Sequence, residues 1–336
     1  MRTAAFVSSF RSQTQLESTT TPNAGDTKDS VISDEDDEDD AMLTAKGLLK
    51  RDRYVATNRF AVRKGQQAKF EKRWATRKSR LATLPGFRYF HLMRRVTPKT
   101  GASGVEYVYD EGSNDEEAQE NYVSFTIWDK KSAFSAWRKG DAFKEAHGGT
   151  SIGAFLSTMV NSALVLRGAP RPAFYDGLLT QSVQPAEGDL KGKIVDGWRS
   201  VEADGVNTLP AECFVALQKY FILPDQQQAF EQLWKNREST IASYDGFVAS
   251  SLMRRDGTAK GHGMGEISSS EPNYVSAVVF RNQQDFEKWT NQHEKDVAAK
   301  KEKMTAGGAE LPKFWNKEPE KVLYEGTLVI SSEQGA

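Results

Sequence analysis

The side chains best suited to chemistry in this sequence are an indole and an imidazole placed ten positions apart. They belong to Trp137 and His147. In a straight helix ten residues rise about 15 Å, so both side chains could not touch one small ligand. Between them lies Gly140-Asp141, a pair that predicts a break in the helix and the start of a new turn. Two short helices joined at an angle, with an aromatic ring at one end and an imidazole at the other, suit a broad planar ligand.

Two stretches of the sequence occur twice. Phe70 to Arg95 recurs 160 positions later, with Trp74, Gly86 and Arg94 among the shared residues. Tyr122 to Trp137 recurs 152 positions later, after a shorter loop. Matches that keep one spacing and one order are far beyond chance, so the chain carries an internal duplication. Shared residues then report the fold, and unshared polar residues are candidates for the chemistry.

The two copies differ at two polar positions. The first frame places Asn58 opposite Gln218, and the second frame places His147 opposite Ala299. Because Ala cannot bind a metal ion, only the first copy keeps a candidate ligand. Asn is uncommon within strands, which favours a functional role for Asn58.

Length and composition agree with two domains. The 336 residues exceed the usual single-domain size, and two repeats of about 125 residues can each bury a core of ordinary depth. The net charge of -1 argues against a nucleic-acid binder. The lone Cys213 excludes an internal disulfide framework and a CxxCH heme attachment, and it favours a reducing compartment. No apolar run approaches the roughly 18 to 20 residues of a membrane span, so we expect none.

Residues 1–50 lie outside the repeats and are predicted to be disordered. Met1 to Leu16 has no acid before Glu17, a composition typical of a transit peptide for a plastid or a mitochondrion. An ordinary disordered tail on a cytoplasmic protein is the alternative. Residues 34–40, the acidic run, are seven consecutive acids. Because such charges repel one another, the run predicts a solvated spacer.

The repeats are assigned to residues 51–182 and 211–336, joined by a linker over 183–210. Within each repeat the hydrophobic periods and turn residues predict the order strand, helix, strand, strand, helix, strand. In the first copy the predicted strands are 54–62, 87–96, 121–128 and 172–180, the helices are 65–83 and 131–139, and a loop covers 97–120.

This order predicts an α+β fold built from two ferredoxin-like repeats. An antiparallel sheet with helices on one face leaves its other face bare, and the second copy is the natural cover. We therefore expect a monomeric chain that forms an intramolecular pseudo-dimer, with packed antiparallel sheets or a shared β-barrel.

The segment from Ser124 to His147, SFTIWDKKSAFSAWRKGDAFKEAH, resembles the antibiotic biosynthesis monooxygenase (ABM) superfamily, specifically its heme-degrading IsdG-type branch. That branch has an Asn on the first strand, a Trp on the penultimate helix and a His ten residues after it. Asn58, Trp137 and His147 match this pattern. The resemblance covers residues 54–180 well and residues 214–331 as a degenerate copy.

The resemblance implies a monooxygenase that opens the heme macrocycle and releases iron. Heme would be both substrate and cofactor, with dioxygen and an external electron donor, such as a partner reductase, completing the reaction. His147 would bind the iron, Trp137 would press against and ruffle the macrocycle, and Asn58 would hydrogen-bond to dioxygen on the distal side. Phe134 and Phe143 would complete the heme-binding set in the first repeat, which leaves the second repeat a structural role.

Several alternatives stay open. A heme carrier or sensor would use the same pocket without turnover, and other branches of the superfamily oxidise polycyclic aromatics without a cofactor. His147 could instead cap helix carbonyls, and Trp137 could only pack the core, because Trp289 persists in the copy without the His. Arg94 and Arg95 recur in both copies, which favours structural pairing over binding of heme propionates. The remaining histidines, His91, His262 and His293, lack motif support.

Overall fold

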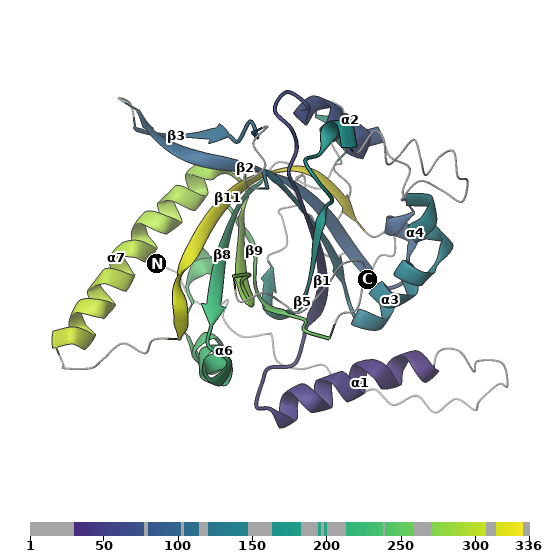
Figure 1. The fold of residues 1–336 in the computed structure, drawn as a ribbon. Helices are drawn as coiled ribbons and strands as arrows, with labels where there is room; N and C mark the ends of the chain where they lie inside the picture. The colour runs from purple at the N-terminus through teal and green to yellow at the C-terminus, as the bar shows by residue number, and fades with distance from the viewer. Residues whose placement is uncertain are drawn as a thin grey trace, which may run out of the picture.

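The structure is a computed structural model in which helices surround a closed β-barrel (Figure 1). The helices are α1 (Ser30–Ala45), α2 (Gln67–Thr76), α3 (Lys131–Lys139), α4 (Asp141–Ala146), α6 (Gln227–Asn236) and α7 (Gln283–Ala306), with 3-10 turns η1 (Leu81–Thr83), η2 (Pro224–Gln226) and η3 (Ile241–Ser243). The structure describes residues 30–76, 80–101, 104–113, 120–146, 163–182, 194–195, 198–199, 213–237, 239–258, 270–306 and 314–331.

The barrel is antiparallel and contains strands of both repeats. The strands are β1 (Arg53–Phe60), β2 (Phe87–Gly101), β3 (Gly104–Tyr109), β4 (Tyr122–Trp128), β5 (Arg171–Ser182), β8 (Phe214–Ile222), β9 (Phe247–Arg255), β10 (Tyr274–Phe280) and β11 (Trp315–Ser331), beside a small separate pair, β6 (Ile194–Val195) and β7 (Trp198–Arg199). The barrel order is β11-β8-β10-β9-β5-β1-β4-β2, closed by the β11–β2 pairing, and β3 extends β2. The β5–β9 and β2–β11 seams each join one repeat to the other, so the expected shared barrel is confirmed.

The strand register confirms the equivalence of the two repeats. Asn58 lies opposite Ser124 in the β1–β4 pair, and Gln218 lies opposite Ser276 in the β8–β10 pair. The residue pairs related by the 160-residue spacing and by the 152-residue spacing therefore occupy equivalent positions in the two repeats.

Side chains of each strand alternate between the inside and the outside of the barrel. Val55 belongs to an apolar cluster drawn from both repeats, which includes Met93, Val215 and Val275. Its neighbour Tyr54 belongs instead to a cluster formed only by the first repeat and its helices. The two repeats therefore share one interior core. The outer core of the first repeat is its own, whereas the outer clusters of the second repeat also take in Val96 and Leu178 of the first.

Helices close each outer core. Phe70 of α2 and Phe134 of α3 pack on the first repeat, whereas Phe230 of α6 and Phe286 of α7 pack on the second. Full burial of such a ring stabilises a fold by roughly 1.5 to 3 kcal/mol. In Figure 1, α3 and α4 lie on one side of the barrel and α7 lies on the opposite side.

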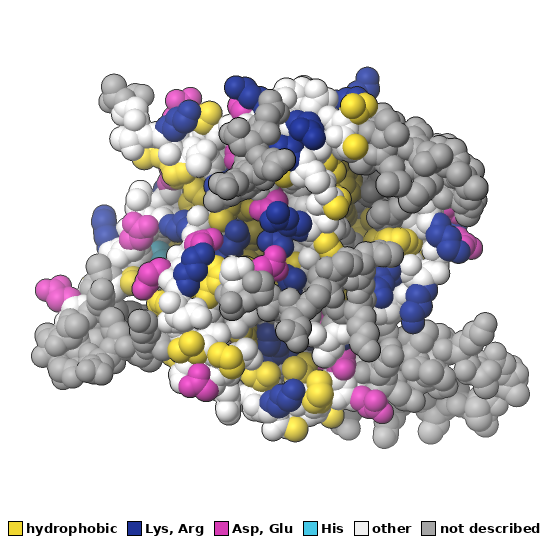
Figure 2. Space-filling view, in the orientation of Figure 1, with side chains coloured by type: hydrophobic (Ala, Val, Ile, Leu, Met, Phe, Trp, Pro, Cys, Tyr) yellow, Lys and Arg dark blue, Asp and Glu magenta, His cyan; other side chains and the backbone are white. Residues whose placement is uncertain are grey.

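A charged pair crosses the β5–β9 seam between the repeats. At the β5–β9 seam, Arg254 Nη2 lies 2.9 Å from Asp176 Oδ2 and Arg254 Nη1 lies 2.8 Å from Glu231 Oε1. At the β2–β11 seam, the equivalent Arg94 lies opposite Glu325 in the strand register. Arg94 itself pairs within the first repeat, with Glu71 at 3.5 Å and Glu111 at 3.2 Å. Both equivalent arginines therefore have the structural partners that were expected. Over the face drawn in Figure 2, acidic and basic side chains are interspersed.

The acidic run does not form a solvated spacer, so the prediction of disorder is wrong for helix α1. Asp36 is only 7% exposed and accepts a hydrogen bond from the Ser132 backbone N–H, at 3.3 Å, and another from the Ser132 hydroxyl. Asp39 Oδ2 lies 3.1 Å from Arg51 Nη2 and 3.0 Å from Lys131 Nζ. These cations offset the mutual repulsion of the carboxylates. Because Lys131 is remote in sequence, the local composition did not reveal this docking.

The loop predicted over residues 97–120 is also partly wrong. Its first half continues β2 to Gly101 and returns as β3, with Thr97 opposite Val108 in the pairing. β3 pairs with β2 beyond the barrel, and this pairing accounts for a strand where composition indicated loop. No helix among the described residues is long and apolar enough to cross a membrane.

Candidate functional site

Asn58 lies at the centre of the outer face of the first repeat's sheet. On β1, the outward-facing residues to either side of it include Tyr54 and Phe60. The Tyr54 ring lies 5.3 Å from the Phe134 ring of α3, whereas the Phe60 ring lies 5.7 Å from the Trp74 ring of α2. Asn58 therefore lies between the part of the strand that α3 covers and the part that α2 covers.

A row of small and apolar side chains crosses the sheet beside Asn58. Ser124 and Leu92 follow it in the register of β4 and β2, and they are 1% and 0% exposed. Asn58 itself is half-buried, and its amide makes no hydrogen bond to any other residue that the structure describes. An amide has two N–H donors and a carbonyl acceptor, so a ligand over this face can accept a hydrogen bond from Asn58 or donate one to it.

Two buried tyrosines of this layer stay uncharged. The Tyr54 hydroxyl donates to Asp256 Oδ2 at 2.9 Å, and the Tyr122 hydroxyl donates to Glu71. Burial raises the pKa of both phenols, and the neighbouring carboxylate raises each pKa further. The aromatic layer around Asn58 therefore gains no charge from these rings near neutral pH.

The break predicted between Trp137 and His147 is confirmed. Gly140 has extended backbone angles, φ −87° and ψ 172°, and it separates α3 from α4. Trp137 lies in the last turn of α3, with its ring 5.0 Å from that of Phe143 on α4 and 5.4 Å from that of Trp128. The angle between the helices thus brings Phe143 back against Trp137.

The other predicted site residues of this segment differ in their surroundings. Phe134 is 5% exposed and packs against Tyr54 and Phe174, each at a ring distance of 5.3 Å. His147 follows the last residue of α4 and lies outside the described residues. Its role as iron ligand stays a prediction.

The second repeat lacks the helix break. Gln292 stands where the first repeat has Gly140, and α7 continues without interruption through this position. Ala299, opposite His147, is exposed on the same helix. The His293 ring stacks on Trp289 at 5.1 Å, so the retained Trp packs along a straight helix.

His91, a residue of strand β2, faces away from this site. His91 is 2% exposed and lies inside the barrel, where its Nε2 is 3.3 Å from Cys213 Sγ. Burial lowers the pKa of His91 to about 4, so its imidazole is neutral at physiological pH. Its neighbour Leu92 faces the Asn58 side, which excludes His91 from that surface. His262 lies outside the described residues.

Sequence reasoning missed three residues that surround Asn58. Trp74 stacks on Phe90 at 5.1 Å and forms the α2 side of the layer, and Ser124 is the outward residue beside Asn58. From the sequence, Trp74 stood out only as a residue shared by the repeats, Ser124 only as the start of the matched segment, and Phe90 not at all. The strand pattern offered one signal for this site, because it placed the polar Ser124 on the helix-covered face of the sheet beside Asn58.

Comparison with known proteins identifies the repeat. The model of the antibiotic biosynthesis monooxygenase family matches residues 53–149 and again residues 213–300. The chain belongs to the antibiotic biosynthesis monooxygenase family. One match falls on each half of the barrel. The tandem duplication read from the sequence is therefore confirmed at the level of the family.

Individual relatives cover different shares of this family member. It is 34% identical over 94 residues to a staphylobilin-producing heme oxygenase of Staphylococcus haemolyticus, a match that spans 28% of this chain and 72% of that protein. A solved protein of Fusobacterium nucleatum is 10% identical with a TM-score of 0.49, covering 86% of this chain and 98% of its own. A solved anthrone oxidase-like protein is 12% identical with a TM-score of 0.43, covering 85% and 95%.

Proposed function

We propose that this ABM protein is a heme-degrading monooxygenase that binds heme over the outer face of its first repeat, opens the macrocycle and releases iron. The observation that carries the proposal is the amide of Asn58, which bonds to none of the described residues and lies at the centre of an aromatic layer, between α2 and the α3–α4 pair. The 34% identity to a heme oxygenase supports heme as the ligand.

The described residues fit a heme on chemical grounds. A macrocycle is flat and apolar, and Trp74, Phe90 and Trp137 provide aromatic surface on the same side of the sheet as Asn58. A single polar amide among apolar walls is the arrangement that steers oxygen in heme pockets. The chain that follows α4 carries His147, the imidazole proposed to hold the iron.

Each residue has a distinct proposed role. When bound, heme supplies the iron that activates dioxygen, and its own macrocycle is the part that is oxidised. His147 holds the group through a neutral imidazole nitrogen. Asn58 donates a hydrogen bond to dioxygen from the sheet side, and Trp137 presses against the ring from the helix side.

Hemin titration followed by ascorbate under air tests the proposal. We expect a shifted Soret band that saturates at one hemin per chain, because Gln218 and Ala299 replace the polar pair in the second repeat. Ascorbate should then bleach the band, with release of iron and an opened tetrapyrrole detected by mass spectrometry. Asn58→Ala should slow the bleaching several-fold, whereas the matched Gln218→Ala should not.

The other outcomes separate the alternatives. A saturable Soret shift without bleaching or iron release would indicate a heme carrier. No Soret shift at all would exclude heme as the ligand and leave an ABM oxygenase that acts without a cofactor. Two hemins of comparable affinity per chain would contradict the assignment of the site to the first repeat.

A further inference from the structure

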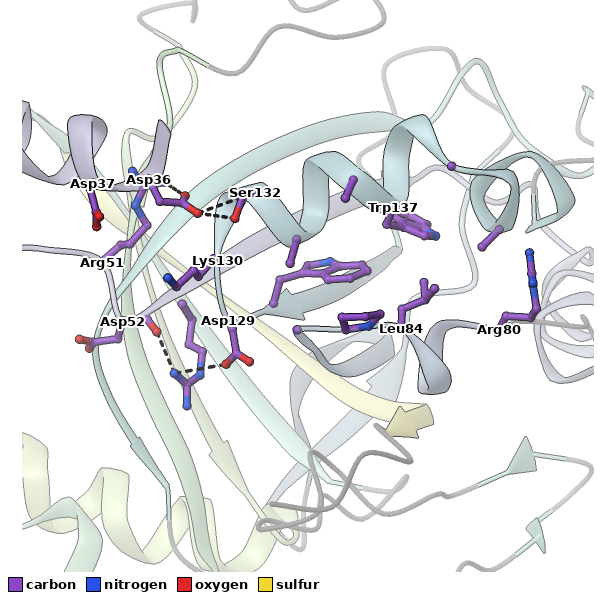
Figure 3. Close-up of a pocket in the computed structure, with 18 of the residues that line it drawn as sticks. Asp36, Asp37, Arg51, Asp52, Arg80, Leu84, Asp129, Lys130, Ser132 and Trp137 are labelled. Carbon is purple, nitrogen blue, oxygen red and sulfur yellow. Dashed lines mark hydrogen bonds and ion pairs between the residues drawn. The ribbon is translucent and has the colours of Figure 1, made fainter. Parts of the chain in front are cut away.

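A cavity of about 1000 Å³ lies beside α3 (Figure 3). It runs between α3–α4, the turn that leads into β2, and the acidic helix α1. Asn58 and Trp74 do not line it, whereas Trp128 and Trp137 do. Its volume is at the upper end of that of small-molecule sites.

The aromatic end of this cavity is a slot with flat walls. In Figure 3 Trp137 and Leu84 project from facing elements, α3 and the turn before β2. The α3 side is made of small residues, Ala133 and Ala136, which leave room beside the indoles. At Gly86, where φ is +71°, an added Cβ would lie 2.7 Å from Ala133 Cβ, so the turn and the helix touch at this point.

The indole N–H of Trp128 is the feature that indicates a ligand. The Trp128 side chain is 0% exposed, and its Nε1 has no hydrogen-bond acceptor among the described residues. A buried donor without an acceptor destabilises the fold, because it has given up its hydrogen bond to water. Trp128 is fully enclosed, so a ligand in the cavity that supplies this acceptor must displace a neighbouring side chain.

The second repeat shows that packing does not require this N–H. Phe280 occupies the position of Trp128, and its ring lies 5.5 Å from Trp289, as Trp128 lies 5.4 Å from Trp137. Among the described residues of the second copy, a larger side chain stands at the position that borders the slot. Asp285 stands where the first repeat has Ala133, and an added Cβ at Gly246 would lie 2.2 Å from its carboxylate.

The far end of the cavity is polar and slightly acidic. Six of the lining residues are acids and four are bases; the acids are Asp36, Asp37, Asp40, Asp52, Asp129 and Asp141, and the bases are Arg51, Arg53, Arg80 and Lys130. This excess of carboxylates disfavours polyanions such as nucleoside phosphates. The polar end suits hydroxyl groups.

We propose that this cavity binds a neutral, planar heteroaromatic molecule with ring carbonyls, about the size of an isoalloxazine. The ring system lies in the slot against Trp137, and a ring carbonyl accepts the hydrogen bond of Trp128 Nε1. An uncharged polar substituent extends toward α1. The site shares Trp137 with the proposed heme site, but its other binding group, Trp128, is not one of the proposed heme-binding residues.

Riboflavin fluorescence tests this site on the intact chain without heme. Stacking on the indoles should quench riboflavin saturably at one molecule per chain, and flavin mononucleotide, with its added phosphate, should bind several-fold more weakly. Ala136→Leu, an exposed position that fills the slot, should weaken riboflavin binding more than about ten-fold. Lys288→Leu, the matched exposed position in the second repeat, should bind as the wild type does.

Trp128→Phe places in the first repeat the residue that the second repeat has, so we expect it to fold, which circular dichroism will check. It should weaken riboflavin binding about five-fold through loss of one hydrogen bond. Unchanged binding by Ala136→Leu, or no saturable quenching of riboflavin by the wild type, would overturn the proposal. Loss of binding in Asn58→Ala would also overturn it, because the ligand would then occupy the outer face of the sheet.

Discussion

Replacing Asp36 with Ala should destabilise the first repeat, although this residue lies outside both matches to the family. Helix α3 has no side-chain cap of its own, since Lys130 at its N-cap position makes no capping hydrogen bond. Asp36 supplies the cap from α1 by accepting the hydrogen bonds of the Ser132 backbone N–H and hydroxyl. Loss of a cap costs about 0.5 to 2 kcal/mol.

The surroundings place the effect toward the upper half of that range. Asp36 is buried, so water does not readily replace its carboxylate. Arg51 loses only its longest ion pair, the 3.9 Å contact of Nη1 with Asp36. It keeps three others: Nη2 lies 3.1 Å from Asp39, Nε lies 3.2 Å from Asp40, and Nη1 lies 3.7 Å from Asp176. We therefore expect a loss of about 1 to 2 kcal/mol, or a decrease in Tm of roughly 2 to 6 °C.

Urea unfolding measured by circular dichroism gives the free energy, and calorimetry gives Tm. Asp37→Ala is the matched control, because Asp37 is exposed on the same helix. Asp36→Asn keeps an acceptor oxygen and should lose less than Asp36→Ala. If Asp36→Ala and Asp37→Ala differ by less than about 0.5 kcal/mol, α1 does not cap α3 and the reasoning fails.

Three further predictions concern the proposed heme site and the buried carboxylate Asp256. His147→Ala should abolish both the shifted Soret band and turnover, whereas Asn58→Ala should keep most hemin binding; equal loss of binding in both would remove the distal role of the amide. Trp137→Phe should slow heme turnover several-fold at nearly unchanged heme affinity, whereas Trp289→Phe should lower only Tm; matching kinetics of the two variants would make Trp137 a packing residue. Burial opposes ionisation of Asp256, but the Lys131 ammonium and hydrogen bonds from Thr258 and Tyr54 hold its pKa below the usual value. Its contribution to stability is therefore present above the unfolded-state pKa near 4 and is lost as pH falls further; Asp256→Asn should flatten the acid limb of a plot of Tm against pH.

Features that depend on local chemistry could be predicted from the sequence. The break at Gly140 follows from a Gly-Asp pair within a helical pattern, and the shared barrel follows from two repeats that each leave a sheet face bare. The docking of α1 could not be predicted, because seven acids repel one another in isolation and only Arg51 and the remote Lys131 make them compatible with packing. The acceptor missing at Trp128 was equally hidden, since it depends on which atoms surround a buried ring.

The β5–β9 and β2–β11 seams have a consequence for how the molecule comes apart. If either repeat unfolded alone, the other would lose a strand partner at both seams and expose its half of the interior core to water. Partly unfolded states of that kind are costly, so the chain should unfold in one cooperative transition in spite of its two repeats. The second repeat thereby sets the lifetime of the first. A destabilising change in β9 or β11 should raise the opening rate of amide hydrogens around Asn58, although at least one intervening strand separates β1 from the altered strand.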